Sequence, residues 1–152
     1  DVSVLAAFKN GGSLSLEAYW RDYTVTDEAD PLISSEPKEA WNLPELQFEF
    51  KANIKIAQKL FVQSNATFWG VRKHSYRNYF INQPLDRASE SVVDLPSFVD
   101  AELRISYQLN DRWEFYIKSE NIFNAPQFRW ANYQVYGTRF LSGIRYNFDL
   151  NL

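Results

Sequence analysis

The sequence predicts an all-β protein, and more narrowly an antiparallel sheet of the kind that closes into a transmembrane β-barrel. Three observations favour this fold class. Apolar and polar residues alternate with a period of two in seven stretches, as they do in strands with two unlike faces. The connections between these stretches are alternately short and long. Aromatic residues, which make up 17% of the chain, gather near both ends of the stretches.

The first two strands are predicted over Val2 to Phe8 and Leu14 to about Val25. Asn10-Gly11-Gly12 between them predicts a tight turn, because glycine adopts positive φ at little steric cost. The alternation stops in the segment from Thr26 to Pro44, which is rich in proline and acidic residues and is therefore predicted to be a long loop.

The other five strands follow the same rule. The segment from Leu46 to Ile56 shows the cleanest alternation, and a helical period of about 3.6 would scatter its apolar residues around the axis. The remaining elements are predicted as strands over Leu60 to Trp69, Val99 to Leu109, Trp113 to Glu120 and Phe140 to Leu150, with loops over His74 to Pro96 and Ile122 to Gly137.

The connections have lengths of three, nineteen, three, about twenty-three, three and about fifteen residues. Outer-membrane barrels have short turns on the periplasmic side and long loops outside, whereas a soluble sandwich has no reason to alternate so regularly. Three-residue turns place Lys9 opposite Ser13, Ile56 opposite Leu60 and Leu109 opposite Trp113.

The third of these turns also predicts a register between its two strands. Arg104 should lie opposite Lys118, and Ser106 opposite Tyr116. Glu102 is then diagonal to Lys118 and Glu120 is diagonal to Arg104, at a separation of about 7 to 8 Å that long side chains can bridge.

The alternation predicts one lipid-facing and one lumen-facing side. Strands of about twelve residues, tilted by about 40°, span roughly 30 Å, which is the thickness of the hydrocarbon core. The predicted lipid-facing residues are Leu46, Phe48, Phe50, Ile54, Ile56, Leu103, Ile105, Ile117 and Ile144. The predicted lumen-facing residues are Glu49, Lys51, Lys55, Glu102, Arg104, Lys118 and Glu120.

The aromatic residues near the strand ends are predicted to form two interfacial belts. The belt at the loop end comprises Trp20, Tyr23, Phe48, Phe68, Trp69, Phe98 and Phe140. The belt at the turn end comprises Phe8, Phe61, Tyr107, Trp113, Tyr146 and Phe148.

Seven strands is an odd number, whereas a complete bacterial single-chain barrel has an even one. We therefore expect residues 1–152 to be the C-terminal part of a larger barrel, with about seven of its strands. Unpaired strand edges are costly in lipid, so the strands Asp1 to Phe8 and Phe140 to Leu150 should pair with strands outside this chain and not with each other.

The last third of the chain resembles the C-terminal end of TonB-dependent outer-membrane receptors. The penultimate strand of that family ends in an N-L/I-F-N motif, here Asn121-Ile122-Phe123-Asn124, and an aromatic loop follows. The closing strand of the family has the form G-R-x-F-x-x-G-x-x-Y-x-F, which corresponds here to residues 137–148. This chain departs from the motif by an inserted Thr138 and by the extension from Asp149 to Leu152.

The resemblance implies a barrel of about 22 strands in the cell outer membrane, closed by an N-terminal plug that lies outside this chain. It implies import of a scarce ligand, such as a metal chelate, cobalamin or a glycan, with energy relayed by TonB. The implied partners are membrane lipid, the plug and remaining strands, TonB and the barrel assembly machinery. Two other functions stay open: a small complete outer-membrane barrel with an adhesin or structural role, and a soluble lipocalin-like binding module.

Aromatic and arginine side chains in the loops are the candidate ligand contacts, because they offer stacking faces and charged donors. They would equally serve as interface anchors or pack loop on loop. The candidates are Trp41, Tyr76, Arg77, Tyr79, Arg129, Trp130, Tyr133 and Tyr136.

Other types of site find little support. His74 is the only histidine, so no catalytic triad or histidine metal site is expected, and we expect no enzyme activity and no cofactor. Asp27, Glu28 and Asp30 lack the spacing of a calcium loop. The composition, 16 basic against 19 acidic residues without a basic tract and without cysteine, excludes nucleic acid as a partner and thiolate chemistry.

The terminal strand suggests an assembly signal. Ile144, Tyr146, Phe148 and Leu150 alternate on one face, as in the strand that the family presents to the barrel assembly machinery. Tyr146 and Phe148 also suit the lower aromatic belt, and one residue can serve both roles. Replacing Phe148 with alanine in the full-length protein should therefore lower the outer-membrane fraction. Normal insertion with a slightly lower melting temperature would reject the recognition role.

Overall fold

The computed structural model describes residues 1–24, 40–77, 90–125, 128–130 and 133–148 of the chain. Its elements are all strands, and their order in the chain is β1 (Val2–Ala7), β2 (Ser13–Trp20), β3 (Leu46–Ala57), β4 (Leu60–Trp69), β5 (Arg72–Arg77), β6 (Glu90–Leu95), β7 (Phe98–Gln108), β8 (Trp113–Glu120), β9 (Phe128–Trp130), β10 (Tyr133–Gln134) and β11 (Arg139–Tyr146). None of the described residues forms a helix long and apolar enough to cross a membrane.

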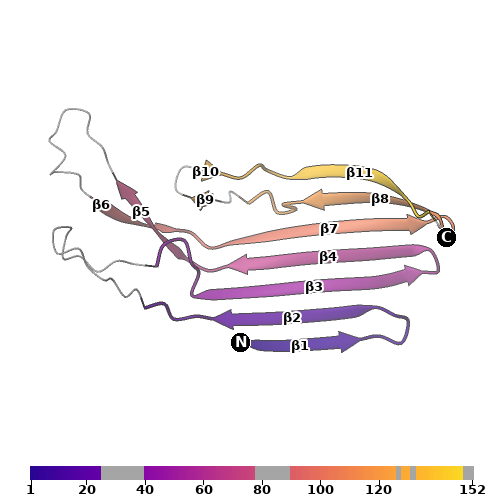
Figure 1. Cartoon of the computed structure of the whole chain (residues 1–152), viewed down its shortest axis with the longest axis horizontal. Coiled ribbons are helices and arrows are strands. Elements are labelled where there is room, and N and C mark those ends of the chain that lie inside the picture. The colour runs from indigo at the N-terminus through magenta and orange to yellow at the C-terminus, as the bar shows by residue number, and fades with distance from the viewer. Residues whose placement is uncertain (25–39, 78–89, 126–127, 131–132, 149–152) are drawn as a thin grey trace.

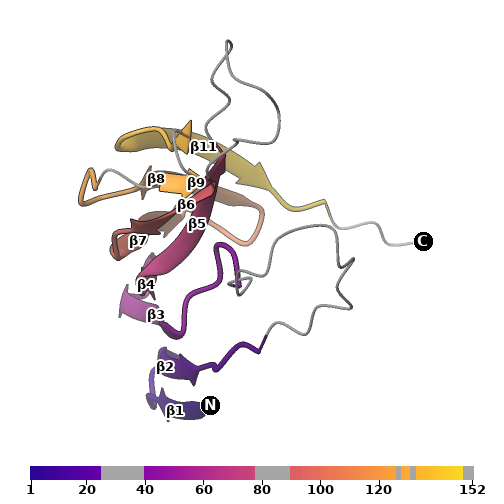
Figure 2. The same cartoon turned by 90° about the vertical axis from the view of Figure 1, so that its left-hand side faces the viewer.

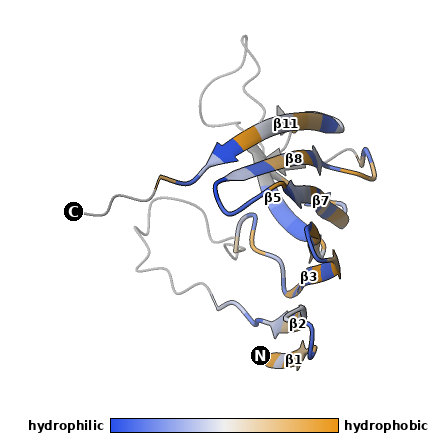
Figure 3. Ribbon diagram, turned by 90° about the vertical axis from the view of Figure 1, so that its right-hand side faces the viewer, coloured by the Kyte–Doolittle hydropathy of each residue, from blue (hydrophilic) through white to orange (hydrophobic). Residues whose placement is uncertain are grey.

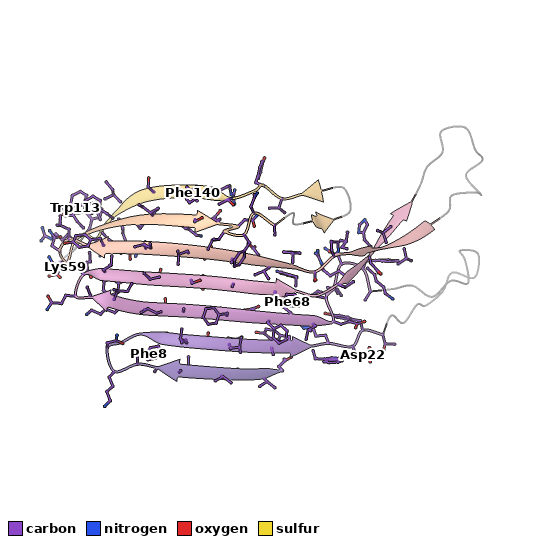
Figure 4. All side chains as sticks on the ribbon, turned by 180° about the vertical axis from the view of Figure 1, so that it is seen from behind. Phe8, Asp22, Lys59, Phe68, Trp113 and Phe140 are labelled. Carbon is purple, nitrogen blue, oxygen red and sulfur yellow. The ribbon has the colours of Figure 1, made fainter. Side chains whose placement is uncertain are left out.

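Seven strands form one antiparallel sheet in the order β1-β2-β3-β4-β7-β8-β11, so its strands follow one another in chain order, and β5–β6 and β9–β10 lie in the connections between them (Figure 1). These are the seven predicted strands, and the all-β prediction is confirmed. The short turns lie together at one end of the sheet. The segments that were predicted to be loops leave from the opposite end, so Lys59 and Trp113 lie far from Asp22 (Figure 4).

The register of β7 on β8 is the predicted one, with Arg104 opposite Lys118 and Ser106 opposite Tyr116. The register of β3 on β4 is also as predicted along most of its length, for example Lys55 opposite Phe61. A bulge between Lys55 and Ala57 shortens that turn to two residues, so the predicted pair of Ile56 and Leu60 is wrong.

The first turn lies one residue earlier than predicted. Ala7, not Lys9, lies opposite Ser13, and the amide of Phe8 donates to the carbonyl of Gly12 at 2.8 Å. Gly11 takes the positive φ of 84° that the turn needs, while Gly12 approaches the carbonyl of Asn53 too closely for a side chain. The register is therefore shifted by two residues, which leaves every side chain on its predicted face.

Two of the predicted loops contain strands. β5 and β6 pair over six residues each, and β9 pairs with β10, in two small sheets beyond the loop end of the main sheet (Figure 1). His74 was predicted in a loop but lies on β5 opposite Val93. The first predicted loop is described only from Ala40 onward, so Asp27, Glu28 and Asp30 lie outside the described residues.

The main sheet is curved, and its seven strands trace an arc when seen end-on (Figure 2). On β7 and β8 its apolar side chains are more exposed than its charged ones. Ile105 and Ile117 are 44% and 61% exposed, whereas the side chains of Glu114 and Arg104 are 20% and 21% exposed. Side chains crowd together on the concave face of a curved sheet and spread apart on the convex face, so the charged residues line the concave face.

The sheet has almost no hydrophobic core of its own. In the parts of the chain that the structure describes, the buried apolar residues are Ala52, Leu95 and Ala101. Apolar and polar residues alternate along the strands (Figure 3), and the apolar set forms a continuous exposed face. An apolar surface of this extent indicates a membrane or a large partner.

The two outer strands of the sheet do not meet. Among the described residues, β1 pairs with β2 alone and β11 pairs with β8 alone. The prediction that the chain does not close on itself is confirmed, and each outer strand presents an edge of backbone N–H and C=O groups.

Candidate functional site

The concave face carries a chain of ion pairs over β7, β8 and β11. The ammonium of Lys118 lies 2.6 Å from Glu102 and 3.1 Å from Glu120, and Arg139 lies 2.6 Å from Glu120. Glu102 and Glu120 stand directly opposite each other, so Lys118 separates two like charges. The amide of Asn65 on β4 also donates to Glu102 at 2.6 Å.

A second group lies nearer the turn end. Arg104 binds Glu114 at 2.5 Å, and Arg145 binds the same carboxylate at 3.3 Å. Sequence placed Arg104 diagonal to Glu120, but its guanidinium extends in the other direction and lies over the ring of Tyr116 at 4.1 Å. Tyr116 covers Gly143 so closely that a side chain at that position would clash with its ring. The absence of a side chain at Gly143 thus leaves room for the tyrosine ring.

The charged residues that are predicted to face the lumen all lie on the concave face. Lys51 forms a third group of ion pairs, with its ammonium 3.3 Å from the Glu49 carboxylate and 3.9 Å from the Glu17 carboxylate. Positive and negative side chains thus alternate across the concave face. Such a surface stays hydrated or meets another polar surface, and it does not suit lipid.

The belt prediction needs a correction at three residues. Trp69 pairs with Gln47 and Phe61 pairs with Lys55, and both partners lie on the concave face. Phe98 pairs with Trp69, so all three aromatic residues lie on that face. Trp69 and Phe98 stack at 6.1 Å. On the apolar face, Phe48 packs on Phe68 at the loop end (5.8 Å), and at the turn end Trp113, Tyr146 and Phe148 pack in a row at 4.6 and 4.5 Å.

Arg72, which the sequence did not single out, anchors the loop end. It is 3% exposed, lies over the rings of Phe98 and Trp69 at 5.0 and 6.0 Å, and donates to Asn42 Oδ1 at 2.9 Å. Burial lowers the pKa of its guanidinium from the ordinary value. The amide of Asn42 in turn donates to the carbonyl of Lys73 at 2.7 Å, which ties the end of the first loop to β5.

Asn121, Asn124 and Thr138 form an asparagine clasp at the base of the third loop. The Asn121 amide group donates to the carbonyls of Ala125 and Tyr136 at 3.3 and 3.1 Å, and its Oδ1 accepts from the Ala125 amide at 3.2 Å. Thr138 donates from its hydroxyl to the Asn121 carbonyl and from its amide to Asn124 Oδ1. The Asn-Ile-Phe-Asn motif and the inserted Thr138 therefore work together to connect β8 to β11.

The candidate ligand residues fall into two groups at the loop end. Tyr76 and Arg77 lie on β5, and Trp41 is half-buried at its base, bridged to Lys73. Arg129 and Trp130 lie on β9, Tyr133 on β10, and Tyr136 follows them, 77% exposed and 5.9 Å beneath the Arg139 guanidinium. Tyr79 lies outside the described residues.

A small hollow of about 260 Å³ lies at the base of the first group. Tyr23, Glu45, Lys73 and Asp94 contribute its polar lining. Tyr23, a predicted belt residue, donates its hydroxyl to the carbonyl of Pro44 at 3.2 Å. Within the described ranges, no cluster of three or more histidine or acidic side chains could hold a metal ion.

Comparison with solved structures gives two similar folds. The siderophore receptor PirA from Acinetobacter baumannii superposes with a TM-score of 0.67 at 17% identity, over 96% of this chain and 21% of the receptor. The ferripyoverdine receptor of the outer membrane of Pseudomonas aeruginosa, bound to ferripyoverdine, superposes with a TM-score of 0.56 at 13% identity, over 96% of this chain and 26% of the receptor.

The chain thus spans about a fifth to a quarter of the length of these receptors and has the fold of part of their β-barrels. No family model matches the sequence, and no curated protein matches it. The expected fold is confirmed.

Proposed function

We propose that this chain forms part of the barrel wall and outer loops of a TonB-dependent transporter that imports a scarce ligand across the outer membrane. The observation that carries the proposal is the distribution of side chains on the sheet. Charged side chains lie on its concave face, and apolar side chains are exposed on its convex face, the reverse of a soluble barrel. A lipocalin-like module would enclose its apolar side chains instead. Lipid must cover the convex face, and the concave face must line the lumen or contact the plug.

The two outer strands support the larger barrel. β1 and β11 lie at opposite ends of the arc, and each exposes a strand edge that lipid cannot satisfy. A small complete barrel would join them. We propose instead that other strands of the same protein pair with both, as the coverage of about a fifth to a quarter of the similar receptors suggests.

Replacing Ile117 with arginine tests the membrane-facing side. In the full-length protein refolded into lipid vesicles, this change should lower the free energy of unfolding by about 2 kcal/mol, because it places a charge in the hydrocarbon region. The matched control is Leu141→Arg, because Leu141 lies on the adjacent strand, on the concave face, and is 47% exposed. That control should cost less than about 1 kcal/mol, which is the repulsion expected from Lys118 directly opposite it. Equal effects in urea titrations would reject the membrane orientation.

We further propose that the two loop-end groups contact the ligand before import. Tyr136 is the best-placed member, because its ring is exposed and lies beneath the guanidinium of Arg139. Replacing Tyr136 with alanine should weaken ligand binding by roughly 1 to 2 kcal/mol in binding free energy at an unchanged surface level. Phe123, 66% exposed on the other side of the clasp, supplies the control Phe123→Ala. Unchanged binding in Tyr136→Ala would show that this ring is only an interface anchor.

The role of Tyr146 and Phe148 in assembly is also a proposal. Their rings meet edge to face, with centroids 4.5 Å apart, and Phe148 is 79% exposed, which leaves it accessible to a partner. The Phe148→Ala measurement described above separates recognition by the assembly machinery from membership of the belt.

A further inference from the structure

A groove of about 600 Å³ crosses the apolar face of β7, β8 and β11. Six of the eight residues that line it belong to the apolar face: Ile105, Tyr107, Phe115, Ile117, Ser142 and Ile144. Ser142 stands directly opposite Ile117, and Gly143 follows it, so small residues on β11 form the floor and branched side chains form the walls. None of the lining residues carries a charge.

Cations lie in the short turns at one end of the sheet, and Lys59 and Arg112 are the two near one end of this groove. The three short turns comprise residues 9–11, 58–59 and 110–112 and contain Lys9, Lys59 and Arg112 against one carboxylate, Asp111. Lys59 lies close to the turn that holds Arg112, because its ammonium donates to the carbonyl of Leu109, in the same turn, at 2.6 Å. Tyr107 and Phe115 of the groove stand opposite each other on the two strands that this turn joins, and the turn lies at the end of the sheet that faces the viewer in Figure 3.

We propose that the groove holds an acyl chain of an anionic phospholipid whose phosphate lies at Lys59 and Arg112. The proposal rests on the proposed function, because it requires the apolar face to contact lipid. The packed rings of Trp113 and Tyr146 lie between groove and turn, at the depth where aromatic side chains meet headgroups. The uncharged groove matches the acyl chain of one lipid, the aromatic pair beside it matches the ester region, and the basic turn beyond matches the phosphate. A neutral lipid would fill the groove but gain nothing from the cations.

The test measures lipid binding to the full-length protein in non-ionic detergent by native mass spectrometry. The probes are dioleoyl phosphatidylglycerol, which is anionic, and dioleoyl phosphatidylcholine, which is zwitterionic. We expect the anionic lipid to bind the unaltered protein at least about fivefold more tightly, since each nearby cation contributes about that factor. Equal affinities would overturn the headgroup assignment.

Two variants separate the parts of the site. Ser142→Phe fills the groove and should lower the affinity for both lipids by about tenfold. The control Leu16→Phe, on the same face but on β2, should leave both affinities unchanged. Arg112→Gln should remove most of the preference for the anionic lipid and leave the binding of phosphatidylcholine unchanged. If Ser142→Phe binds both lipids as tightly as Leu16→Phe does, the groove is not the site of the acyl chain. Heat-modifiable gel mobility verifies that each variant is folded.

The outcomes also distinguish the groove from the membrane orientation. If Ile117→Arg proves costly and Ser142→Phe has no effect on lipid binding, the transporter proposal stands and the lipid site fails. If Ile117→Arg proves neutral, the transporter proposal fails, and the lipid site fails with it.

Discussion

Replacing Asn121 with alanine should cost about 3 to 4 kcal/mol of unfolding free energy, the largest effect that we expect from a single polar residue in this chain. The residue is 5% exposed, and its side chain makes three hydrogen bonds that water cannot replace without opening the loop base. Its φ of 47° adds to the cost, because alanine tolerates the left-handed region less well than asparagine. Urea titration of the full-length protein in vesicles measures the loss.

Asn124→Ala is the matched control for this prediction. Asn124 has a similar φ of 49°, but its side chain is more exposed and is held by one hydrogen bond, from the Thr138 amide at 3.2 Å. We expect a loss of roughly 1 to 2 kcal/mol. Equal losses in the two variants would mean that backbone conformation, and not the three side-chain bonds of Asn121, stabilises the clasp.

The clasp connects stability to function. It fixes the distance between the end of β8 and the start of β11, and the segment between them carries four of the eight ligand candidates. Asn121→Ala should therefore disturb that loop even where the barrel remains folded.

The strands and their faces were predictable because successive side chains alternate between the two faces. A register error of two residues therefore leaves each side chain on its predicted face. The first turn shows this: sequence offered two adjacent glycines and could not tell which one takes positive φ, yet the shift to Gly11 left all faces unchanged. The bulge near Ile56 was not predictable, because the extra residue keeps the local apolar pattern.

The small loop-end sheets were missed for a different physical reason. β5 and β6 lie beyond the main sheet, and Arg72–Arg77 carries no apolar face, so the alternation that predicts the other strands is absent there. Their backbone hydrogen bonds leave little trace in the sequence.

The misplaced belt residues did leave a signal. Trp69 has the parity of Asn65, and Phe98 has the parity of Glu102, which places both on the charged face. The position of both residues near a strand end predicts the belt, whereas their parity predicts the charged face, and Arg72 lies between their rings and Asn42.

Replacing Lys118 with methionine should cost roughly 2 to 3 kcal/mol of unfolding free energy, because it leaves Glu102 and Glu120 directly opposite each other without the cation between them. Methionine keeps most of the apolar stem, so the loss reports the charge. Asn65 and Arg139 still hold one carboxylate each, at 2.6 Å in both cases, which keeps the effect below that of a fully buried pair.

The double variant Lys118→Met with Glu102→Gln should recover most of that loss, because it removes one of the two facing charges. Lys51→Met is the control for removing a lysine from the same face. Its side chain is 49% exposed and lies 3.3 Å from Glu49 and 3.9 Å from Glu17, so a loss of less than about 1 kcal/mol is expected. Urea titration of these three variants, of Glu102→Gln alone and of the unaltered protein completes the cycle. A double variant as unstable as Lys118→Met alone would show that repulsion between Glu102 and Glu120 does not cause the loss.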